Sequence, residues 1–193
     1  YFRQNLLLSK DLSIFYGDRC VANGISLTLN RGDRIALVGR NGCGKSSLLK
    51  LLIGQPIAHT GTLEIGSRLT VSYVPQDMSF LSGSADNFAA ESEIDITLFK
   101  TILRKLDFKR TQFTKDMSEF SMGQKKKVLL ARSLCQRANL YIWDEPLNYI
   151  DVISRLQIET LILEYKPTML FVEHDEAFVN DIATKVCRIS LNQ

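Results

Sequence analysis

Long hydrophobic runs are absent from this sequence. Its apolar stretches are short, and one of the longest, residues 48–53, is interrupted by Lys50. Such stretches fall far short of the ~20 consecutive apolar residues that a helix needs to cross a bilayer, and no secretory signal pattern opens the chain. We therefore expect a soluble, cytoplasmic protein that does not insert directly into a membrane.

Cysteine is scarce, and the cysteines do not occur in pairs. Four of them are scattered over 193 residues, at positions 20, 43, 135 and 187. A zinc site or a disulfide framework would place cysteines at short, regular spacings. The spacing therefore indicates neither, and reduced thiols are the simplest account.

An excess of charge of either sign is also lacking. The 24 basic and 21 acidic residues leave a formal net charge of +3, which is too small to indicate nucleic-acid binding by itself. One run of three lysines, Lys125 to Lys127, predicts a solvated helix face. The chain has no internal repeat, and its length and 45% hydrophobic content predict a single domain core.

A glycine-rich segment is present at residues 39–46, which read Gly-Arg-Asn-Gly-Cys-Gly-Lys-Ser. This spacing is that of a phosphate-binding loop. An apolar strand is expected before it at 34–38, and an amphipathic helix is expected to begin near Lys45 and to end before Gly54 and Pro56. This context disfavours a chance glycine turn before a lysine. The segment therefore predicts that the chain binds a nucleoside triphosphate.

The chemistry of the loop assigns roles to its residues. Glycines let backbone N–H groups curl around phosphates, and the helix N-terminus contributes roughly half a positive charge toward the same anion. Lys45 would reach the terminal phosphates, and Ser46 offers a hydroxyl to Mg²⁺, a hard cation that prefers oxygen ligands. The candidate nucleotide-binding residues of the loop are Gly39, Asn41, Gly42, Cys43, Gly44, Lys45, Ser46 and Ser47.

Hydrophobic patterning predicts a β-rich first part and an alternation of strands and helices after it. The expected strands are 6–14, 24–29, 34–38, 62–65, 69–74, 140–143, 168–172 and 185–190. The expected helices are 45–53, 122–137, 152–165 and 176–183, with helical spacing also at 98–106. The first strands are expected to be antiparallel, and the later alternation predicts a parallel sheet with right-handed crossovers.

Two adjacent carboxylates, Asp144 and Glu145, end one of the predicted strands. Ligands of α/β sheets bind at the carboxyl ends of strands, so both acids are expected to face the phosphates. Because adjacent side chains diverge on a strand, Asp144 can hold the magnesium ion through water while Glu145 polarises an attacking water. Capping of the strand before Pro146 is the alternative, and the complete loop upstream makes it the weaker one.

Four segments complete a pattern that identifies a family. They are Tyr-Val-Pro-Gln-Asp at 73–77, Phe-Ser-Met-Gly-Gln at 120–124, Asp-Glu-Pro at 144–146 and Glu-His-Asp at 173–175. In identity, order and approximate spacing they resemble the ATP-binding-cassette (ABC) ATPases over nearly the whole chain. We call residues 120–124 the signature segment. Glycine is usual in that family where Met122 stands.

The resemblance implies an α/β fold of the P-loop nucleoside-triphosphatase type. The expected form is an ABC nucleotide-binding domain with a mixed or parallel core sheet, an N-terminal antiparallel β layer and a small helical subdomain. We expect one such domain over residues 1–193, with the helical subdomain at about 84–137. The resemblance further implies ATP as the nucleotide, Mg²⁺ as the cofactor and ATP hydrolysis as the activity.

The roles of family residues transfer position by position. By resemblance, Tyr16 stacks on adenine and Gln76 senses the magnesium ion and the attacking water. His174 contacts the γ-phosphate, and Glu145 is the general base. The expected metal ligands are Ser46, Gln76 and Asp144. An ordinary half-buried aromatic is the alternative for Tyr16, and an ordinary loop histidine is the alternative for His174.

The resemblance also implies a partner. In the family, the signature segment of one domain closes over the nucleotide held by the loop of another. Ser121, Gly123 and Gln124 are therefore expected to contact the ATP of a second cassette, in the same full-length chain or in a homodimer. Phosphoryl transfer depends on positioning and charge neutralisation, so we expect weak hydrolysis by the isolated domain.

Two details resemble the ABC-F branch, whose members act on ribosomes, more than the transporters. Residues 147–151 read Leu-Asn-Tyr-Ile-Asp, which is similar to the Asn-His-Leu-Asp of ABC-F, whereas transporters commonly have Ser-Ala-Leu-Asp. Only the 44 residues from 77 to 120 separate Gln76 from Ser121, which is short for a subdomain that holds a membrane partner. Tyr149 and Glu173 depart from the usual histidine and serine.

These two departures, together with residues 171–178, resemble more narrowly the ABC-F proteins that protect bacterial ribosomes from antibiotics, and the second of their two cassettes. We therefore expect a fragment of a longer two-cassette protein that reaches the ribosome and its RNA through a helical linker. Two alternatives remain: the nucleotide-binding subunit of an ABC membrane transporter, and a cassette that binds nucleotide only as a structural switch. The presence of Glu145 argues against the second alternative.

Overall fold

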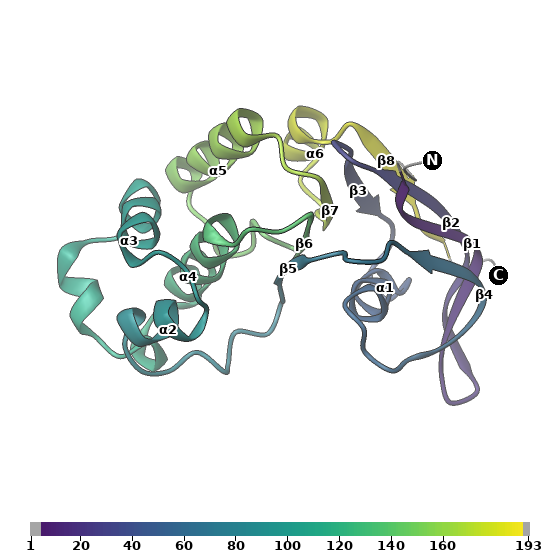
Figure 1. The fold of residues 1–193 in the computed structure, drawn as a ribbon, viewed down its shortest axis with the longest axis horizontal. Helices are drawn as coiled ribbons and strands as arrows, with labels where there is room; N and C mark the ends of the chain where they lie inside the picture. Colours follow the sequence, from purple (N-terminus) through teal and green to yellow (C-terminus); the bar gives the residue numbers. More distant parts are fainter. Residues whose placement is uncertain (1–4, 191–193) are drawn as a thin grey trace. The chain divides into compact units, whose positions relative to one another are not determined.

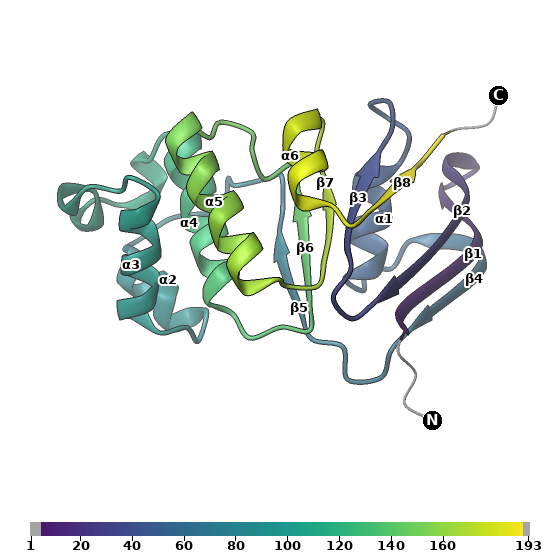
Figure 2. The same cartoon turned by 90° about the horizontal axis from the view of Figure 1, so that it is seen from above.

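The computed structural model describes residues 5–190, whose strands and helices are drawn in Figures 1 and 2. The strands are β1 (Asn5–Tyr16), β2 (Arg19–Asn30), β3 (Arg34–Val38), β4 (Ala58–Ile65), β5 (Val71–Val74), β6 (Leu140–Asp144), β7 (Met169–Val172) and β8 (Lys185–Arg188). The α-helices are α1 (Lys45–Leu52), α2 (Ala85–Glu91), α3 (Ile96–Lys105), α4 (Met122–Cys135), α5 (Val152–Tyr165) and α6 (Glu176–Ile182). Two short 3-10 helices are η1 (Arg110–Thr114) and η2 (Met117–Glu119). Within residues 5–190, no helix is both long and apolar enough to span a bilayer.

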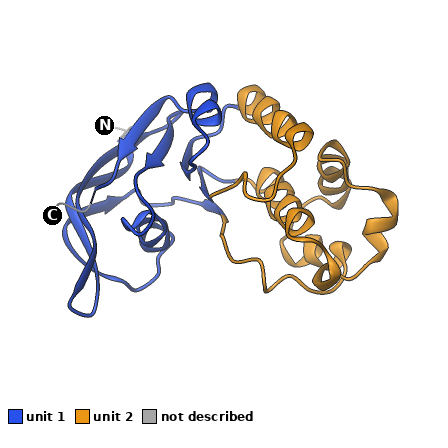
Figure 3. Cartoon of the chain, turned by 180° about the vertical axis from the view of Figure 1, so that it is seen from behind, with its two compact units in different colours: residues 1–73, 138–144, 166–193 blue, residues 74–137, 145–165 orange. Residues whose placement is uncertain are grey.

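The described chain divides into two compact units, which Figure 3 colours separately. Unit 1 holds residues 5–73, 138–144 and 166–190, with both sheets, α1 and α6. Unit 2 holds residues 74–137 and 145–165, with α2 to α5. Helix α5 therefore groups with the helices expected at 84–137, although it lies beyond that range.

The first sheet of unit 1 is antiparallel and has the strand order β2-β1-β4. Along β2, Ile25, Leu27 and Leu29 are buried and the residues between them are exposed, as the period of two along a strand requires. The antiparallel layer predicted for the start of the chain is confirmed.

The second sheet of unit 1 has the order β5-β6-β7-β3-β8, and its pairs β6–β7, β7–β3 and β3–β8 are parallel. All four residues of β7 are buried, as expected for a parallel strand covered on both faces. Helix α1 packs its apolar side into the same core, where Leu48 and Leu52 join Ile35 of β3. The predicted α/β fold with a parallel core sheet is confirmed.

Two strands run differently from the expectation. Strand β4 begins at Ala58, four residues earlier than predicted, and pairs with β1. Strand β5 belongs to the other sheet. Residues 66–70 therefore connect the two sheets of unit 1.

Side-chain caps begin three helices of unit 2. Ser84, Asp95 and Ser121 accept hydrogen bonds from backbone N–H groups three residues further on, at the starts of α2, α3 and α4. Ring contacts add to the packing of this unit, with 6.3 Å between the centroids of Phe88 and Phe99. Local caps and helical spacing thus explain why the predicted helices were found close to their expected bounds.

The lysine run on α4 is not a solvated face, so that prediction is wrong. Lys126 is only 1% exposed, and the side chain of Lys127 is 11% exposed. Positions four apart share one side of a helix, and Leu130 is fully buried. Position 126 therefore faces the core, whatever its charge.

Candidate functional site

The phosphate-binding loop of unit 1 connects β3 to α1, and close backbone packing determines its shape. A Cβ atom at Gly39 would lie 2.4 Å from the carbonyl oxygen of Ile189. A Cβ atom at Gly44 would lie 2.4 Å from the carbonyl oxygen of Val21, and Gly44 also has a φ of 89°. Only glycine fits these two positions without a shift of the neighbouring backbone. The loop therefore lies directly against β2 and against the segment that follows β8.

Lys45 holds its ammonium group inside the loop. The residue is 6% exposed, and Nζ donates hydrogen bonds to the carbonyl oxygens of Gly39 at 2.7 Å and Arg40 at 2.9 Å. Its third neighbour is Sγ of Cys43 at 3.7 Å. Because sulfur is a weak acceptor, a phosphate oxygen would replace it readily. The ammonium group is thus positioned in advance for an anion.

The first turn of α1 is open to an anion as well. Its N-cap is Gly44, and no side chain within residues 5–190 caps this end of the helix. The first N–H groups of a helix have no partner within the helix, so those of Lys45, Ser46 and Ser47 form a region of partial positive charge that attracts an anion. Three features of the loop suit the phosphates of a nucleoside triphosphate: two positions where only glycine fits, an ammonium group held in place, and an uncapped helix start.

A hollow of about 600 Å³ adjoins the loop in unit 1. Loop residues Gly39, Asn41 and Cys43 line it, together with Arg40 and Arg188. Lys45 and Ser46 are not among its lining residues, so the hollow lies beside the phosphate cradle. Its two guanidinium groups add positive charge next to the loop.

Strand pairing brings three predicted groups of unit 1 to one edge of the parallel sheet. Asp144 of β6 and Leu37 of β3 both pair with Val172 of β7. The loop at 39–46 and His174 follow β3 and β7, so they lie at the same carboxyl edge as Asp144. Asp144 is 1% exposed, whereas His174 is exposed. Asp144 and Ser46 offer the oxygen ligands that Mg²⁺ prefers.

Tyr73 and Glu173 are two further residues of unit 1 that interact with groups at this edge. Burial, and after it the negative charge of Asp144, raise the pKa of Tyr73 to about 12, so this phenol is neutral at pH 7. Glu173 is 5% exposed, and its Oε1 accepts a hydrogen bond from the backbone N–H of His174 at 3.1 Å. The glutamate that stands where serine is usual therefore holds the backbone of the predicted γ-phosphate contact.

Tyr16 ends β1 and is 47% exposed. It pairs with Arg19 of β2, and Ile14 of β1 pairs with Ala22. Ala22 borders Gly44, since a Cβ atom at Gly44 would meet it at 2.5 Å. Tyr16 therefore lies on the end of the hairpin that backs the loop, where an exposed ring can stack on a base.

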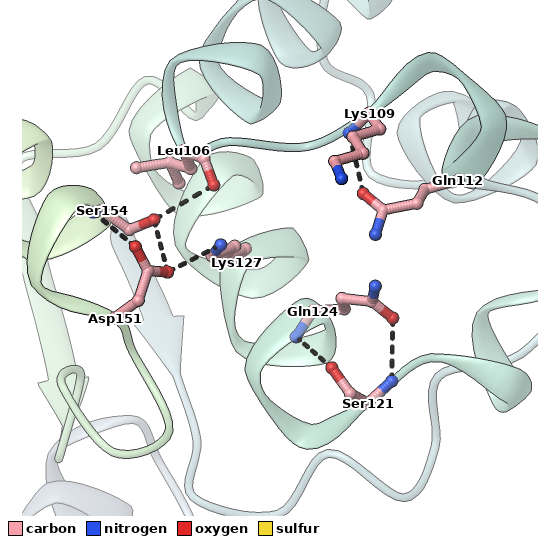
Figure 4. Close-up of polar contacts among 8 residues, drawn as sticks. All are labelled: Leu106, Lys109, Gln112, Ser121, Gln124, Lys127, Asp151 and Ser154. Carbon is pink, nitrogen blue, oxygen red and sulfur yellow. Dashed lines mark hydrogen bonds and ion pairs between the residues drawn. The ribbon is translucent and has the colours of Figure 1, made fainter.

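The signature segment of unit 2 starts α4 with a reciprocal pair of hydrogen bonds, shown in Figure 4. Ser121 Oγ accepts from the N–H of Gln124 at 3.2 Å, and Gln124 Oε1 accepts from the N–H of Ser121 at 2.9 Å. This capping box satisfies two orphan donors of the helix end. A polar hollow of about 340 Å³ opens beside it.

Glycine is required at only one of the two positions that follow Ser121. A Cβ atom at Gly123 would lie 2.6 Å from the carbonyl oxygen of Tyr149. Met122 is 46% exposed, so its larger side chain is accommodated at the surface. The departure from glycine at position 122 therefore leaves the start of α4 intact.

Residues 145–151 follow β6 and belong to unit 2. Several of their polar side chains make hydrogen bonds and an ion pair that the sequence did not predict. Nδ2 of Asn148 donates to Oε2 of Glu145 at 2.6 Å. Asp151 accepts from Nζ of Lys127 at 2.9 Å and from the backbone N–H of Ser154 at 3.0 Å, as Figure 4 shows for Lys127. Asp151 and Lys127 are 24 positions apart, so no local pattern could have paired them.

The predicted residues thus form two sets. Unit 1 brings together the loop, Tyr16, Asp144 and His174. Unit 2 contains Gln76, which is exposed just beyond β5, together with Glu145 and the signature residues Ser121, Gly123 and Gln124.

Comparison with known sequences places these motifs in a family. The family model described as ABC transporter matches residues 22–148. YdiF of Bacillus subtilis is 36% identical, over 96% of this chain and 30% of its own length. The ATP-binding protein Uup of Caulobacter vibrioides is 31% identical over 91% of this chain and 30% of its own, and ABC transporter F family member 2 of Arabidopsis thaliana is 29% identical over 96% and 28%. The chain spans about 30% of the length of such relatives.

Solved structures share the fold. An ATP-binding subunit of an ABC transporter superposes with a TM-score of 0.81 at 22% identity, over 96% of this chain and 88% of that one. RNase-L Inhibitor superposes with a TM-score of 0.79 at 25% identity, over 100% and 38%. An archaeal ribosome recycling factor in complex with the ribosomal stalk protein aP1 gives the same values. The family model covers well over half of the chain, and the chain therefore belongs to the ABC transporter family, as one of its ATPase domains.

Proposed function

We propose that this chain binds Mg-ATP and hydrolyses it as one cassette of an ABC-F protein that acts on the bacterial ribosome. The observation that carries the proposal is the phosphate cradle of unit 1. There the ammonium group of Lys45 is held by two carbonyl oxygens next to an uncapped helix start. In this proposal Lys45 and the loop N–H groups bind the phosphates, and Tyr16 stacks on adenine.

The hydrolytic step is assigned to Ser46 of α1 and to side chains that end or follow strands of the parallel sheet. Ser46, Asp144 and Gln76 would hold Mg²⁺, which when bound neutralises phosphate charge. Glu145 accepts the proton of the attacking water, and His174 contacts the γ-phosphate. Phosphoryl transfer is mostly positioning and charge neutralisation, which suits groups carried by rigid strands.

A second cassette completes the proposed site. Ser121, Gly123 and Gln124 would face the ATP bound to the loop of that cassette, in the same full-length chain or in a homodimer. The capping box uses the N–H groups of Ser121 and Gln124, and the N–H groups of Met122 and Gly123 have no partner within the helix, at a helix start beside a polar hollow of unit 2. A helix start of this kind attracts anions, which supports the proposal.

The ABC-F assignment is supported by two observations. Relatives of this chain include a plant ABC transporter F family member and bacterial Uup proteins. Asn148 follows the Asp144–Pro146 strand end as it does in ABC-F proteins. Action on the ribosome is proposed from the branch, and a structural neighbour described as a ribosome recycling factor is in keeping with it.

Ribosome binding is tested with the full-length protein that contains this chain. Replacing Glu145→Gln should prevent hydrolysis and keep the ATP state, so the variant should sediment with ribosomes only when ATP is present. The matched control adds Lys45→Ala, which should abolish the ATP-dependent sedimentation. Sedimentation with membrane vesicles instead would favour the nucleotide-binding subunit of a transporter, a function suggested by the description of the structural match at TM-score 0.81.

Protection against antibiotics is the narrowest part of the proposal, and it depends on the resemblance of Tyr149 and of residues 171–178, which include Glu173. The full-length protein, expressed in a drug-sensitive strain, should allow growth at drug concentrations that stop the parent strain. This chain by itself should not, because the proposed action requires two cassettes and residues 5–190 form one. Resistance conferred by this chain alone would contradict the proposal.

A further inference from the structure

Asn148 makes a contact that none of the roles described above uses. Its Nδ2 lies 2.6 Å from Oε2 of Glu145, within unit 2. An ionised carboxylate can only accept hydrogen bonds, so the amide group that faces it is the NH₂ donor. The short distance is that of a charge-assisted hydrogen bond.

This bond restricts the direction of the Glu145 carboxylate. With Oε2 held by Asn148, rotation about the terminal side-chain torsion, which is otherwise broad for glutamate, is limited. The backbone around the pair is also constrained, since Glu145 has a φ of 50° and Tyr149 a φ of 67°. Left-handed conformations of residues other than glycine are costly and persist only where the surroundings hold them.

The residues that follow Asn148 are held by contacts within unit 2. Tyr149, the next residue, has its carbonyl oxygen packed against Gly123 of α4. Two residues further, Asp151 is bound to Lys127 of α4 at 2.9 Å and to the hydroxyl of Ser154 at 2.8 Å (Figure 4). The segment 147–151 is therefore fastened to the signature helix, and Asn148 is presented to Glu145 from a fixed backbone.

We propose that Asn148 is a positioning residue, which holds the carboxylate of Glu145 in one orientation for its role as the general base. The inference rests on the proposed function, because only there does Glu145 receive the proton of the attacking water. Asn148 itself does not need to touch the nucleotide. Correct orientation of a general base accounts for part of its contribution to rate.

The contact is tested first without any activity measurement. In an amide NMR spectrum of the chain, the side-chain NH₂ signals of Asn148 are identified by their loss in Asn148→Ala. They should shift when Glu145 is replaced by Ala, whereas those of the exposed Asn180 should stay in place. Unchanged Asn148 signals in Glu145→Ala would overturn the proposal.

The consequence for hydrolysis is tested by a double-mutant cycle. Asn148→Ala should lower kcat about 10-fold and leave the Kd for Mg-ATP within about twofold, because the residue acts after binding. Asn148→Asp should lower kcat at least as much, since two carboxylates would then repel each other. Asn180→Ala should leave both values unchanged.

The same cycle separates this proposal from the proposed function. Adding Asn148→Ala to Glu145→Gln should not lower the residual rate further, because Asn148 acts through Glu145. If Asn148→Ala lowered the rate by the same factor in the parent and in Glu145→Gln, the positioning role would be overturned and Glu145 would remain the base. If Glu145→Gln hydrolysed ATP at the parent rate, the assignment of the base would fail, and the positioning role would fail with it.

Discussion

At the scale of single residues, the charged groups of the candidate site are held by fixed partners. The ammonium group of Lys45 is held by two carbonyl oxygens in unit 1. The carboxylate of Asp151 is held by Lys127 and Ser154 in unit 2. Side chains that are already fixed before a ligand binds lose little conformational entropy on binding. The effect of replacing such a side chain can therefore be predicted from the contacts it makes.

Replacing Lys45→Ala should weaken the binding of Mg-ATP about 10- to 100-fold, since a charge-assisted hydrogen bond contributes roughly 1.5–3 kcal/mol. The measurement is a calorimetric titration with a nonhydrolysable ATP analogue. Lys50→Ala is the matched control, because Lys50 lies on the same helix but is exposed. Similar weakening by both variants would mean that overall charge, not the held ammonium group, governs binding.

Protonation of Asp151 should lower the free energy of unfolding at acidic pH. Burial alone would raise its pKa, but the hydrogen bonds from Lys127 and Ser154 outweigh burial, and the pKa of this carboxyl lies below its usual value. The stabilisation is therefore present above the unfolded pKa of about 3.9 and is lost as the pH falls below it. Because the Asp151 side chain is 47% exposed, the pair contributes only about 0–1 kcal/mol.

The check is the free energy of unfolding in urea at pH 7 and pH 3. Asp151→Asn should lose less stability than the parent between these values, while Asp181→Asn, at an exposed position, should behave like the parent. If Asp151→Asn lost as much unfolding free energy between pH 7 and pH 3 as the parent, the ion pair of Asp151 with Lys127 would contribute nothing.

At the scale of helices and strands, the phosphate-binding loop depends on strands far from it in sequence. The backbone of β2 at Val21 lies against Gly44, and the backbone after β8 at Ile189 lies against Gly39. The two sheets of unit 1 share one core with α1. The loop is therefore supported by tertiary packing and not by its own motif alone.

Replacing Gly44→Ala should destabilise the chain by about 2 kcal/mol more than Gly54→Ala. Both glycines have a φ near 90°, so both variants carry similar backbone strain, but a Cβ atom at Gly54 would meet no atom of the described residues within 4 Å. The difference between their free energies of unfolding isolates the clash with β2. Equal destabilisation would contradict the close packing of β2 on the loop.

Local signals allowed most elements to be predicted, and contacts distant in sequence explain what was missed. Strand β3 and helix α5 have the predicted bounds, because apolar patterning and nearby turn residues mark them. The pairing of β4 with β1 and the burial of Lys126 depend on tertiary packing, which charge and local pattern do not report. In the candidate site, the glycines and Lys45 were predicted from their spacing, whereas the bonds from Lys127 to Asp151 and from Asn148 to Glu145 were not.

At the scale of the whole molecule, the chain contains one phosphate-binding loop and one signature segment, divided between its two compact units. It spans about 30% of the length of its curated relatives. If a second cassette supplies signature residues in trans, the chain alone lacks a complete hydrolytic site.

Hydrolysis per chain should therefore be slow in dilute solution and should rise with protein concentration as chains associate. Steady-state ATPase rates over a wide range of protein concentrations measure this dependence. Gly123→Ala, which would bring a Cβ atom to 2.6 Å from the Tyr149 carbonyl oxygen, should reduce the rise. A fast rate that is independent of concentration would mean that one chain is sufficient.

The central claim is that a cradle of backbone N–H groups and the held ammonium group of Lys45 binds the phosphates of ATP. Isothermal titration calorimetry of the folded chain with Mg-ATP or a nonhydrolysable analogue tests this claim most directly. We predict saturable heat with one nucleotide per chain, and an affinity about 10- to 100-fold weaker in Lys45→Ala. Absence of binding heat from the well-folded parent chain would contradict the account.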